Sequence, residues 1–337
     1  MRRPPLLALA ALLLLGGCNR VQSALDPAAD QARSIHGMLL LMLWVCGIMY
    51  LLVLAFLAWA LWRARGKLGR LAVGDAEAET DDRGIERAMG GWAALVVAGL
   101  LVLITGSFLV DRSLAKAGPA PIRVKVTAQQ WWWNVEYEDP DPSQRVTTAN
   151  ELHLPVNRPA EITLESTDVI HSFWVPSLHG KEDLIPGRTN QIQITPRRVG
   201  DYRGQCAEFC GLQHTNMAID VVVDTPAGFD AWKVRQRREA PAPTTAQQQR
   251  GQQIVVSGAC SLCHAVQGTS AGGRTGPDLT HVASRKTIAA GALPYSKASL
   301  AGWIADPQGV KPGANMPIVG LKPADLQAVV AYLDTLK

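Results

Sequence analysis

The sequence of 337 residues has little net charge, few cysteines and, over two long segments, no charged residue at all. A net charge of +4 is too small to indicate nucleic acid as a partner. The six cysteines are not scattered as they would be in a small disulfide-bonded domain. Four of them form the close pairs Cys206/Cys210 and Cys260/Cys263, which more often serve a metal or a cofactor. The length predicts two folded domains of ordinary size.

The N-terminus has the pattern of a secretory signal peptide. Two arginines precede the apolar run 6–15, and small residues follow it, as signal peptidase requires. The order Leu15-Gly16-Gly17-Cys18 also resembles a bacterial lipobox, in which the cysteine is lipidated and becomes the first residue. We therefore predict a lipoprotein-type signal peptide over 1–17 and lipidation of Cys18. An ordinary signal peptide with an incidental cysteine is the alternative.

The uncharged segments 38–61 and 92–110 are each long enough to cross about 30 Å of hydrocarbon as a helix. The stretch between them is rich in basic residues, namely Arg63, Arg65, Lys67, Arg70, Arg83 and Arg87. The positive-inside rule places this stretch in the cytoplasm and everything after Asp111 on the opposite, outer side of the membrane. Cleavage by a signal peptidase requires the same orientation.

These patterns predict an external segment over 18–36 and a transmembrane hairpin over 37–111, surrounded by lipid in a bacterial plasma membrane. We assign no role to Cys46 in the first span, because a buried thiol behaves as a small hydrophobe. Glu86 is interpreted as a solvated residue, with a place on a proton path as the alternative.

From residue 119 to 232 the sequence changes to short β-rich runs. Apolar and polar residues alternate over 122–127, 161–165, 190–195 and 218–223, with Pro, Gly and Asn between the runs. Several short strands at nearly regular spacing predict a β-sandwich.

Potential metal ligands are concentrated in one late loop of this domain. It contains Cys206, Cys210, His214 and Met217, and a further imidazole, His171, lies upstream. Thiolate and thioether are soft ligands and imidazole suits copper, so the set favours copper over magnesium or calcium. A blue-copper centre needs one cysteine, and the second cysteine leaves room for a second metal ion. Zinc bound by two cysteines and two histidines is the alternative, which the additional methionine and the β context disfavour.

Three consecutive tryptophans, Trp131, Trp132 and Trp133, cannot all face one core, because side chains alternate along a strand. At least one should be exposed, and exposed aromatic residues often mark a binding surface. The alternative for Trp131 is a packing role. His153 and His179 lie outside the ligand cluster, and we interpret them as surface or packing residues.

The polar, proline-containing stretch 236–250 predicts a linker to a second external domain over 251–337. This domain opens with Cys260-Ser-Leu-Cys263-His264, the signature for covalent attachment of a c-type haem. No βαβ pattern surrounds it, which argues against a thioredoxin-like redox pair. Met316 precedes a proline and is the expected sixth iron ligand, with His281 as the alternative.

Residues 37–232 resemble subunit II of cytochrome c oxidase. The loop Cys206-x-Glu208-x-Cys210-x3-His214-x2-Met217 is similar to the binuclear copper motif, CuA, of that family. The resemblance implies a cupredoxin-like Greek-key β-sandwich. It further implies bridging by Cys206 and Cys210, terminal ligation by His171 and His214, and weak ligation by Met217 and the Glu208 carbonyl. The Glu208 side chain would reach a Mg²⁺ shared with the large subunit, and Trp131 would be the residue at which electrons enter.

The C-terminal domain resembles an all-α class I cytochrome c, and the fused arrangement is similar to the caa3-type oxidases. This implies electron flow from a cytochrome c-type donor, through haem c and CuA, to the haem a and a3/CuB centres of subunit I, beside subunit III. Dioxygen reduction coupled to proton translocation would occur in that partner, since the spans of this chain carry no histidine cluster. The principal alternative is the CuA subunit of a nitric oxide reductase-type enzyme. A copper chaperone would have little use for covalent haem, and a quinol-oxidase subunit would lack the copper ligands.

Overall fold

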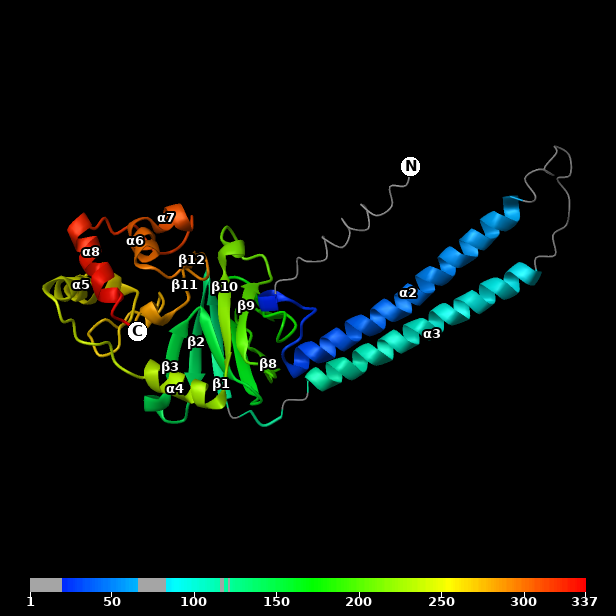
Figure 1. The fold of residues 1–337 in the computed structure, drawn as a ribbon, viewed down its shortest axis with the longest axis horizontal. Coiled ribbons are helices and arrows are strands. Elements are labelled where there is room, and N and C mark those ends of the chain that lie inside the picture. Colours follow the sequence, from blue (N-terminus) through cyan, green and yellow to red (C-terminus); the bar gives the residue numbers. More distant parts are fainter. Residues whose placement is uncertain (1–19, 66–82, 116–117, 121) are drawn as a thin grey trace, which may run out of the picture. The chain divides into compact units, whose positions relative to one another are not determined.

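The computed structural model describes residues 20–65, 83–115, 118–120 and 122–337 (Figure 1). The predicted signal peptide, the predicted lipidation site Cys18 and the basic residues Lys67 and Arg70 lie outside the described residues. The chain divides into two units, of which one is Ser34–Lys116 and the other combines Met1–Arg33 with Ala117–Lys337.

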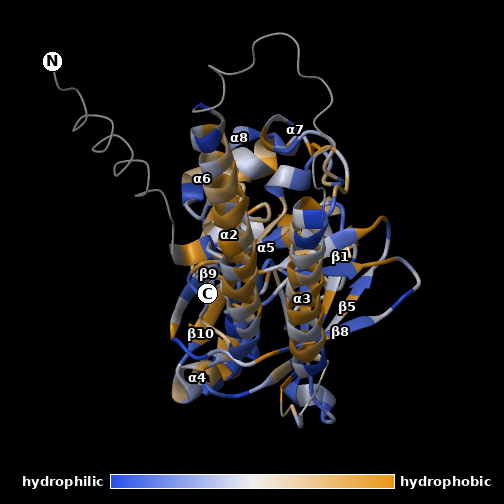
Figure 2. Ribbon diagram, turned by 90° about the vertical axis from the view of Figure 1, so that its right-hand side faces the viewer, coloured by the Kyte–Doolittle hydropathy of each residue, from blue (hydrophilic) through white to orange (hydrophobic). Residues whose placement is uncertain are grey.

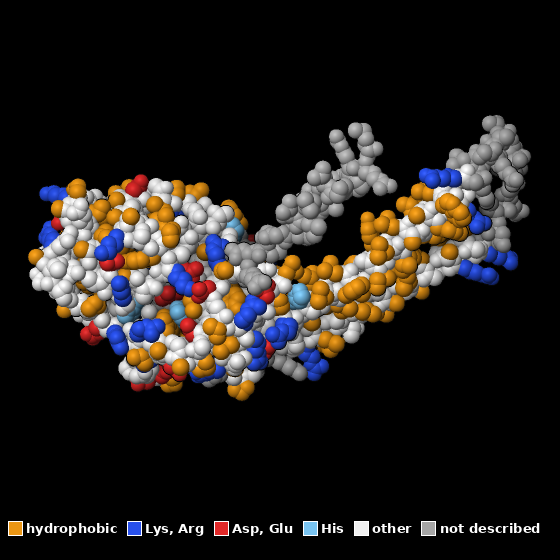
Figure 3. Space-filling model, in the orientation of Figure 1, with side chains coloured by type: hydrophobic (Ala, Val, Ile, Leu, Met, Phe, Trp, Pro, Cys, Tyr) orange, Lys and Arg blue, Asp and Glu red, His pale blue; other side chains and the backbone are white. Residues whose placement is uncertain are grey.

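Two long helices make up the smaller unit. Helix α2 spans Asp30–Arg65 and helix α3 spans Arg83–Leu114, and both are long and apolar enough to cross a membrane. Both helices consist mainly of hydrophobic residues (Figure 2). Their apolar side chains are exposed along most of their length (Figure 3), a surface that water does not favour. Gly106 of α3 allows a close approach, because a Cβ there would lie 2.7 Å from Leu41 of α2. The predicted pair of apolar helices is confirmed.

Residues 122–224 form two five-stranded sheets, in the orders β3-β2-β1-β5-β8 and β4-β10-β9-β6-β7. The strands are β1 (Ile122–Gln129), β2 (Trp132–Glu138), β3 (Val146–Ala149), β4 (Glu151–Pro155), β5 (Ala160–Ser166), β6 (His171–Trp174), β7 (Glu182–Leu184), β8 (Asn190–Ile194), β9 (Gly200–Cys206) and β10 (Ala218–Asp224). Val126 pairs with Val135 on one side and Leu164 on the other, and all three are fully buried. Buried and partly exposed residues alternate along strands such as β5, as expected when one face of a sheet covers a core. The predicted β-sandwich is confirmed.

Helix α4 (Pro226–Gln236) packs against the sandwich through aromatic side chains. The Trp232 ring lies 5.1 Å from that of Tyr137 and stacks on the His153 ring at 4.1 Å. His153 Nδ1 also lies 2.7 Å from Asp224 Oδ2, so its role here is packing.

Residues 20–33 also attach to the sandwich. Ala28 and Ala29 are buried, and the Ala28 amide donates a 2.7 Å hydrogen bond to the Ser177 carbonyl. The Arg197 guanidinium binds the Asp30 carboxylate through two hydrogen bonds of 2.9 and 2.6 Å. The segment before α2 is therefore fixed to the domain that follows α3.

The C-terminal domain is mainly helical, as predicted. Its helices are α5 (Ala246–Ser257), α6 (Lys297–Ala305), α7 (Pro307–Val310) and α8 (Pro323–Leu333), and a short ladder joins β11 (Thr287–Ile288) to β12 (Leu293–Pro294). Helix α5 begins within the segment predicted as linker, because Thr245 and Gln248 form a capping box. Gly251 lets α5 touch α8, since a Cβ there would collide with the Ala328 carbonyl oxygen.

Candidate metal and haem sites

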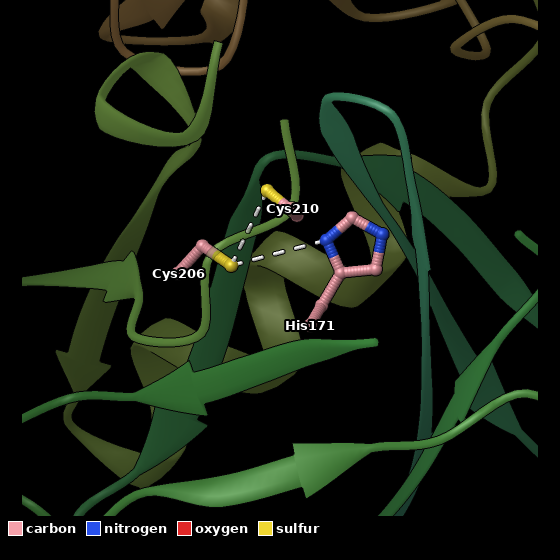
Figure 4. Close-up of side chains that lie close together, drawn as sticks. All are labelled: His171, Cys206 and Cys210. Carbon is pink, nitrogen blue, oxygen red and sulfur yellow. Dashed lines mark hydrogen bonds between the residues drawn. The ribbon is translucent and has the colours of Figure 1, made fainter. Parts of the chain in front are cut away.

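Three predicted metal ligands meet because β6 pairs with β9. His171 opens β6, Cys206 ends β9, and Cys210 lies in the loop that follows; all three are buried. Cys206 Sγ lies 3.8 Å from Cys210 Sγ and 3.8 Å from His171 Nδ1 (Figure 4). The ligand atoms lie within 4.8 Å of one another, a spacing that suits a bound metal.

The remaining predicted metal ligands surround the same two sulfurs. The turn His214–Asn216 brings His214 Nδ1 to 3.6 Å from Cys210 Sγ. The Met217 sulfur lies 4.0 Å from Cys210 Sγ, and the Glu208 carbonyl oxygen lies 3.3 Å from Cys206 Sγ. The structure thus brings all the predicted metal-binding groups of the sandwich together.

Asp168 orients the buried imidazole. Its Oδ1 lies 2.8 Å from His171 Nε2, and its Oδ2 accepts a 2.6 Å hydrogen bond from the backbone amide of Gln130. A carboxylate on Nε2 leaves Nδ1 available to a metal. Burial alone would lower the pKa of His171, but hydrogen bonds to Cys206 and Asp168 raise it overall. Sequence reasoning missed Asp168, although its position three residues before His171 is a usable signal.

The two thiols differ in how readily they ionise. The hydrogen bond from Cys210 lowers the pKa of Cys206 to about 4, against the effect of burial. The same contact raises the pKa of Cys210, because ionisation next to a thiolate is unfavourable. The pair therefore holds one negative charge easily and needs nearby positive charge, such as metal ions, to hold a second.

Trp131 and Gln130 support the backbone of the ligand loop. Trp131 Nε1 donates a 2.9 Å hydrogen bond to the Cys210 carbonyl, and Gln130 Nε2 donates one of 2.7 Å to the same oxygen. Trp131 is 9% exposed and therefore lies among packed residues rather than on a free surface. Trp133 is fully buried, and Trp132, which points the other way, is half-buried. The prediction that at least one of the three tryptophans is exposed is therefore wrong.

The Glu208 carboxylate faces a different environment from its carbonyl. The side chain is 43% exposed, and its Oε2 lies 3.9 Å from Lys181 Nζ. An accessible carboxylate is a ligand that Mg²⁺ prefers, although Lys181 already supplies one positive charge beside Glu208.

The haem attachment motif lies in a tight loop after α5. His264 Nδ1 lies 2.7 Å from the Pro277 carbonyl oxygen, which leaves Nε2 available to iron. Burial lowers the pKa of His264 and so favours the neutral imidazole that metals bind. A Cβ on Gly276 would lie 2.8 Å from His264 Cε1, so glycine is needed beside the ring. Cys260 and Cys263 are half-buried on either side of the exposed Leu262.

Met316 packs against the same hydrophobic core as Cys260. Gln308 holds its loop, since Nε2 donates hydrogen bonds of 2.7 and 3.0 Å to the carbonyls of Ala314 and Met316. The competing candidate, His281, has both ring nitrogens occupied. They lie 3.0 and 3.1 Å from the carbonyl oxygens of Lys337 and Gln236, so Met316 is the better iron ligand.

Arg285 supplies an independent test of whether haem fits. It is 8% exposed, and its Nε has no hydrogen-bond partner among the described residues, while Nη2 donates to the Asp278 carbonyl at 2.6 Å. A buried guanidinium N–H without an acceptor suits an anionic group such as a haem carboxylate. The donor sets of both domains therefore fit the predicted groups.

Comparison with known proteins gives matches for each part of the chain. "Cytochrome C oxidase subunit II, periplasmic domain" matches residues 122–225, and "Cytochrome c" matches residues 248–337. Cytochrome c oxidase subunit 2 of Alkalihalophilus pseudofirmus is 33% identical over 334 residues, which cover 96% of this chain and 94% of that protein. Cytochrome c oxidase subunit 2 of Bacillus sp. PS3 is 32% identical over 266 residues, 73% of each chain. A crystal structure of the periplasmic domain of cytochrome oxidase subunit II from Bradyrhizobium japonicum matches 36% of this chain and 97% of that chain, with 29% identity and a TM-score of 0.34.

Proposed function

We propose, since the chain belongs to the cytochrome c oxidase subunit II family, that it relays electrons from a cytochrome c-type donor to subunit I of a terminal oxidase. The relay would use a haem c in the C-terminal domain and a pair of copper ions in the sandwich. When bound, the haem and the copper pair would each carry one electron at a time. The observation that carries the proposal is the convergence of the soft ligands around Cys206 and Cys210.

The arrangement of imidazoles favours two coppers over one metal ion. His171 Nδ1 lies beside Cys206 Sγ at 3.8 Å, and His214 Nδ1 lies beside Cys210 Sγ at 3.6 Å. Each thiol thus lies beside its own imidazole, so Cys206, Cys210, His171 and His214 would together hold two copper ions, with one imidazole for each. Met217 and the Glu208 carbonyl would be weak ligands, which a closed tetrahedral zinc site does not need.

In the C-terminal domain, Cys260 and Cys263 would form the thioethers to haem, and His264 and Met316 would be the axial ligands. Hydrogen bonds with other residues support both proposed axial ligands. Pro277 orients the His264 ring, and Gln308 bonds to the backbone of the methionine loop. A methionine ligand raises the haem potential, which suits transfer from a soluble donor.

Residues 20–33 support the proposed topology. They contact the sandwich, so the chain before α2 and the chain after α3 share one side of the membrane. Basic residues in the stretch between the helices favour the cytoplasm for that stretch and the periplasmic side for both cofactor domains.

We further propose a lipid anchor at Cys18, Mg²⁺ at Glu208 on the boundary with subunit I, and subunit III as a second partner. Oxygen reduction and proton translocation belong to subunit I in this scheme.

Rapid mixing of the purified complex with reduced cytochrome c tests the relay. We expect haem c to be reduced first and the near-infrared copper band to change as haem c is reoxidised. Copper reduction that precedes haem reduction would contradict the proposed order. Consumption of dioxygen, and not nitric oxide, by the same preparation distinguishes an oxidase from the nitric oxide reductase alternative.

A further inference from the structure

The loop that carries Met316 lies directly on the segment that supports the copper ligands. Lys311 Nζ donates a 2.7 Å hydrogen bond to the Trp131 carbonyl, and Asn315 Nδ2 donates one of 3.3 Å to the Gln130 carbonyl. Gln213, next to His214, donates a 2.8 Å bond from Nε2 to the Pro312 carbonyl. The predicted haem and copper loops are therefore joined by hydrogen bonds in both directions.

Backbone packing tightens the same contact. Gly313 sits against the Trp131 ring, since a Cβ there would lie 3.6 Å from Trp131 Cη2 and 3.2 Å from Leu212 Cδ2. The backbone of Gly313 has a φ of 83°, a conformation that side chains rarely adopt. Trp131 is thus covered by the cytochrome domain, which explains its burial.

Lys311 is the unusual residue of this contact. Its side chain is buried, with 3% exposed, and its Nζ donates hydrogen bonds to the Trp131 and Ala289 carbonyls. In the part of the chain that the structure describes, no carboxylate forms an ion pair with it. Burying a lysine removes its amino group from water, which costs free energy. The hydrogen bonds that Lys311 donates across the contact between the domains offset part of that cost.

A second, strained segment meets the sandwich beside Lys311. Ala289 and Ala290 have φ values of 54° and 58°, which are uncommon outside glycine. The Ala289 carbonyl accepts from Lys311, and the Ala290 carbonyl accepts a 2.9 Å hydrogen bond from the Ala218 amide. Thr287 Oγ1 donates a 2.6 Å bond to Asp220 in the same interface. Strained backbone persists where surrounding contacts fix it, so these bonds favour one arrangement of the two domains.

We propose that Lys311 is a positioning residue. It holds the loop that carries Met316 against Trp131, so that the C-terminal domain keeps one orientation relative to the loop that carries Cys206 and Cys210. This inference rests on the proposed relay from haem to copper. The fused domain then occupies the surface around Trp131, and a soluble donor delivers its electron to the haem domain. Lys311 is none of the proposed cofactor ligands; it acts through the position of the loop.

Substitution Lys311→Met in the intact oxidase tests the role, because methionine keeps the length of the side chain and removes its donors. Lys322→Met is the matched control, a lysine of the same domain that is exposed. After fast photoreduction of haem c, we expect electron transfer to copper to slow about tenfold or more in Lys311→Met and to stay unchanged in the control. Amide hydrogen exchange at Ala218 should become faster, whereas the haem midpoint potential and the copper spectrum should not change.

A wild-type rate together with wild-type exchange at Ala218 would overturn the positioning role. If Lys311→Met fails to load haem or copper, the same measurements are made on Thr287→Val. This variant removes the hydrogen bond from Thr287 to Asp220 between the two domains, away from the proposed cofactor ligands. We expect slower transfer and faster Ala218 exchange in that variant, and unchanged values would again overturn the inference. Absence of any haem-to-copper transfer in the wild-type oxidase would instead overturn the proposed relay.

Discussion

The indole nitrogen of Trp131 donates a 2.9 Å hydrogen bond to the carbonyl oxygen of Cys210. The Trp131 carbonyl in turn accepts a 2.7 Å hydrogen bond from Lys311 of the cytochrome domain. A single residue of the sandwich therefore contacts both a proposed copper ligand and the neighbouring domain. Its substitution should affect the copper site and the transfer between the sites together.

Trp131→Phe removes the donor to Cys210 and also the part of the ring that packs against Gly313. We expect the fold to lose about 1–3 kcal/mol of stability, because part of a buried ring and one hydrogen bond are lost while Gln130 still bonds to the same carbonyl. The near-infrared copper spectrum should shift and haem-to-copper transfer should slow. Trp132→Phe, at the half-buried neighbour, is the control. Equal spectra and rates in both variants would show that the hydrogen bond has no influence on the copper site.

Asp168→Asn should weaken copper binding. The carboxylate that fixes the His171 ring is replaced by a neutral amide, and losses of about ten- to a hundredfold in affinity are typical when such a partner is changed. Competition with a copper chelator measures the affinity. Asp183→Asn, on the neighbouring strand β7, is the control and should match the wild type. Unchanged copper affinity in Asp168→Asn would argue against His171 as a ligand that needs orientation.

Gln308→Ala should loosen the Met316 loop. The variant loses the two hydrogen bonds from Nε2 to the Ala314 and Met316 carbonyls. We expect a lower haem midpoint potential and easier displacement of the sixth ligand by added imidazole. Redox titration and imidazole binding measure both effects, with Gln327→Ala on the exposed side of α8 as the control. A wild-type potential with unchanged imidazole affinity would show that Gln308 does not hold the iron ligand.

Gly276→Ala should displace the His264 ring, because the added Cβ would lie 2.8 Å from His264 Cε1. Overpacking of this kind typically costs about 1–3 kcal/mol, and we expect a smaller haem-loaded fraction and a lower melting temperature. Gly302→Ala in α6 is the control, since its Cβ meets no atom within 4 Å. That change should raise stability by about 0.5–1 kcal/mol. Normal haem loading in Gly276→Ala would contradict the position assigned to the imidazole.

Local sequence patterns were sufficient to predict the fold class and the ligand clusters. Cys206 and Cys210 are four residues apart in the sequence, and Cys260 and Cys263 are three apart, so chain connectivity alone keeps each pair close. The alternating runs and the uncharged segments likewise reflect burial that repeats along the chain. His171 joins the candidate ligands because imidazole suits copper, and the family resemblance then implies its role as a terminal ligand. Its position far upstream of the late loop gives no local sign that the two lie together.

The contacts between the domains could not be predicted in the same way. Lys311 and Trp131 are 180 residues apart, and a lysine in a loop ordinarily indicates a solvated side chain. Burial of Trp131 is likewise a tertiary effect, because the residue lies in the turn between β1 and β2, and strand alternation says nothing about a second domain that covers this turn. Partners such as Asp168 and Gln308 are polar residues whose roles depend on the groups that folding places beside them.

The metal and haem content of the intact purified protein tests the central claim most directly. Elemental analysis combined with paramagnetic resonance should find a pair of copper ions that share one unpaired electron, together with one covalently bound haem, in each chain. A single copper ion, or zinc in place of copper, in fully loaded protein would contradict the account.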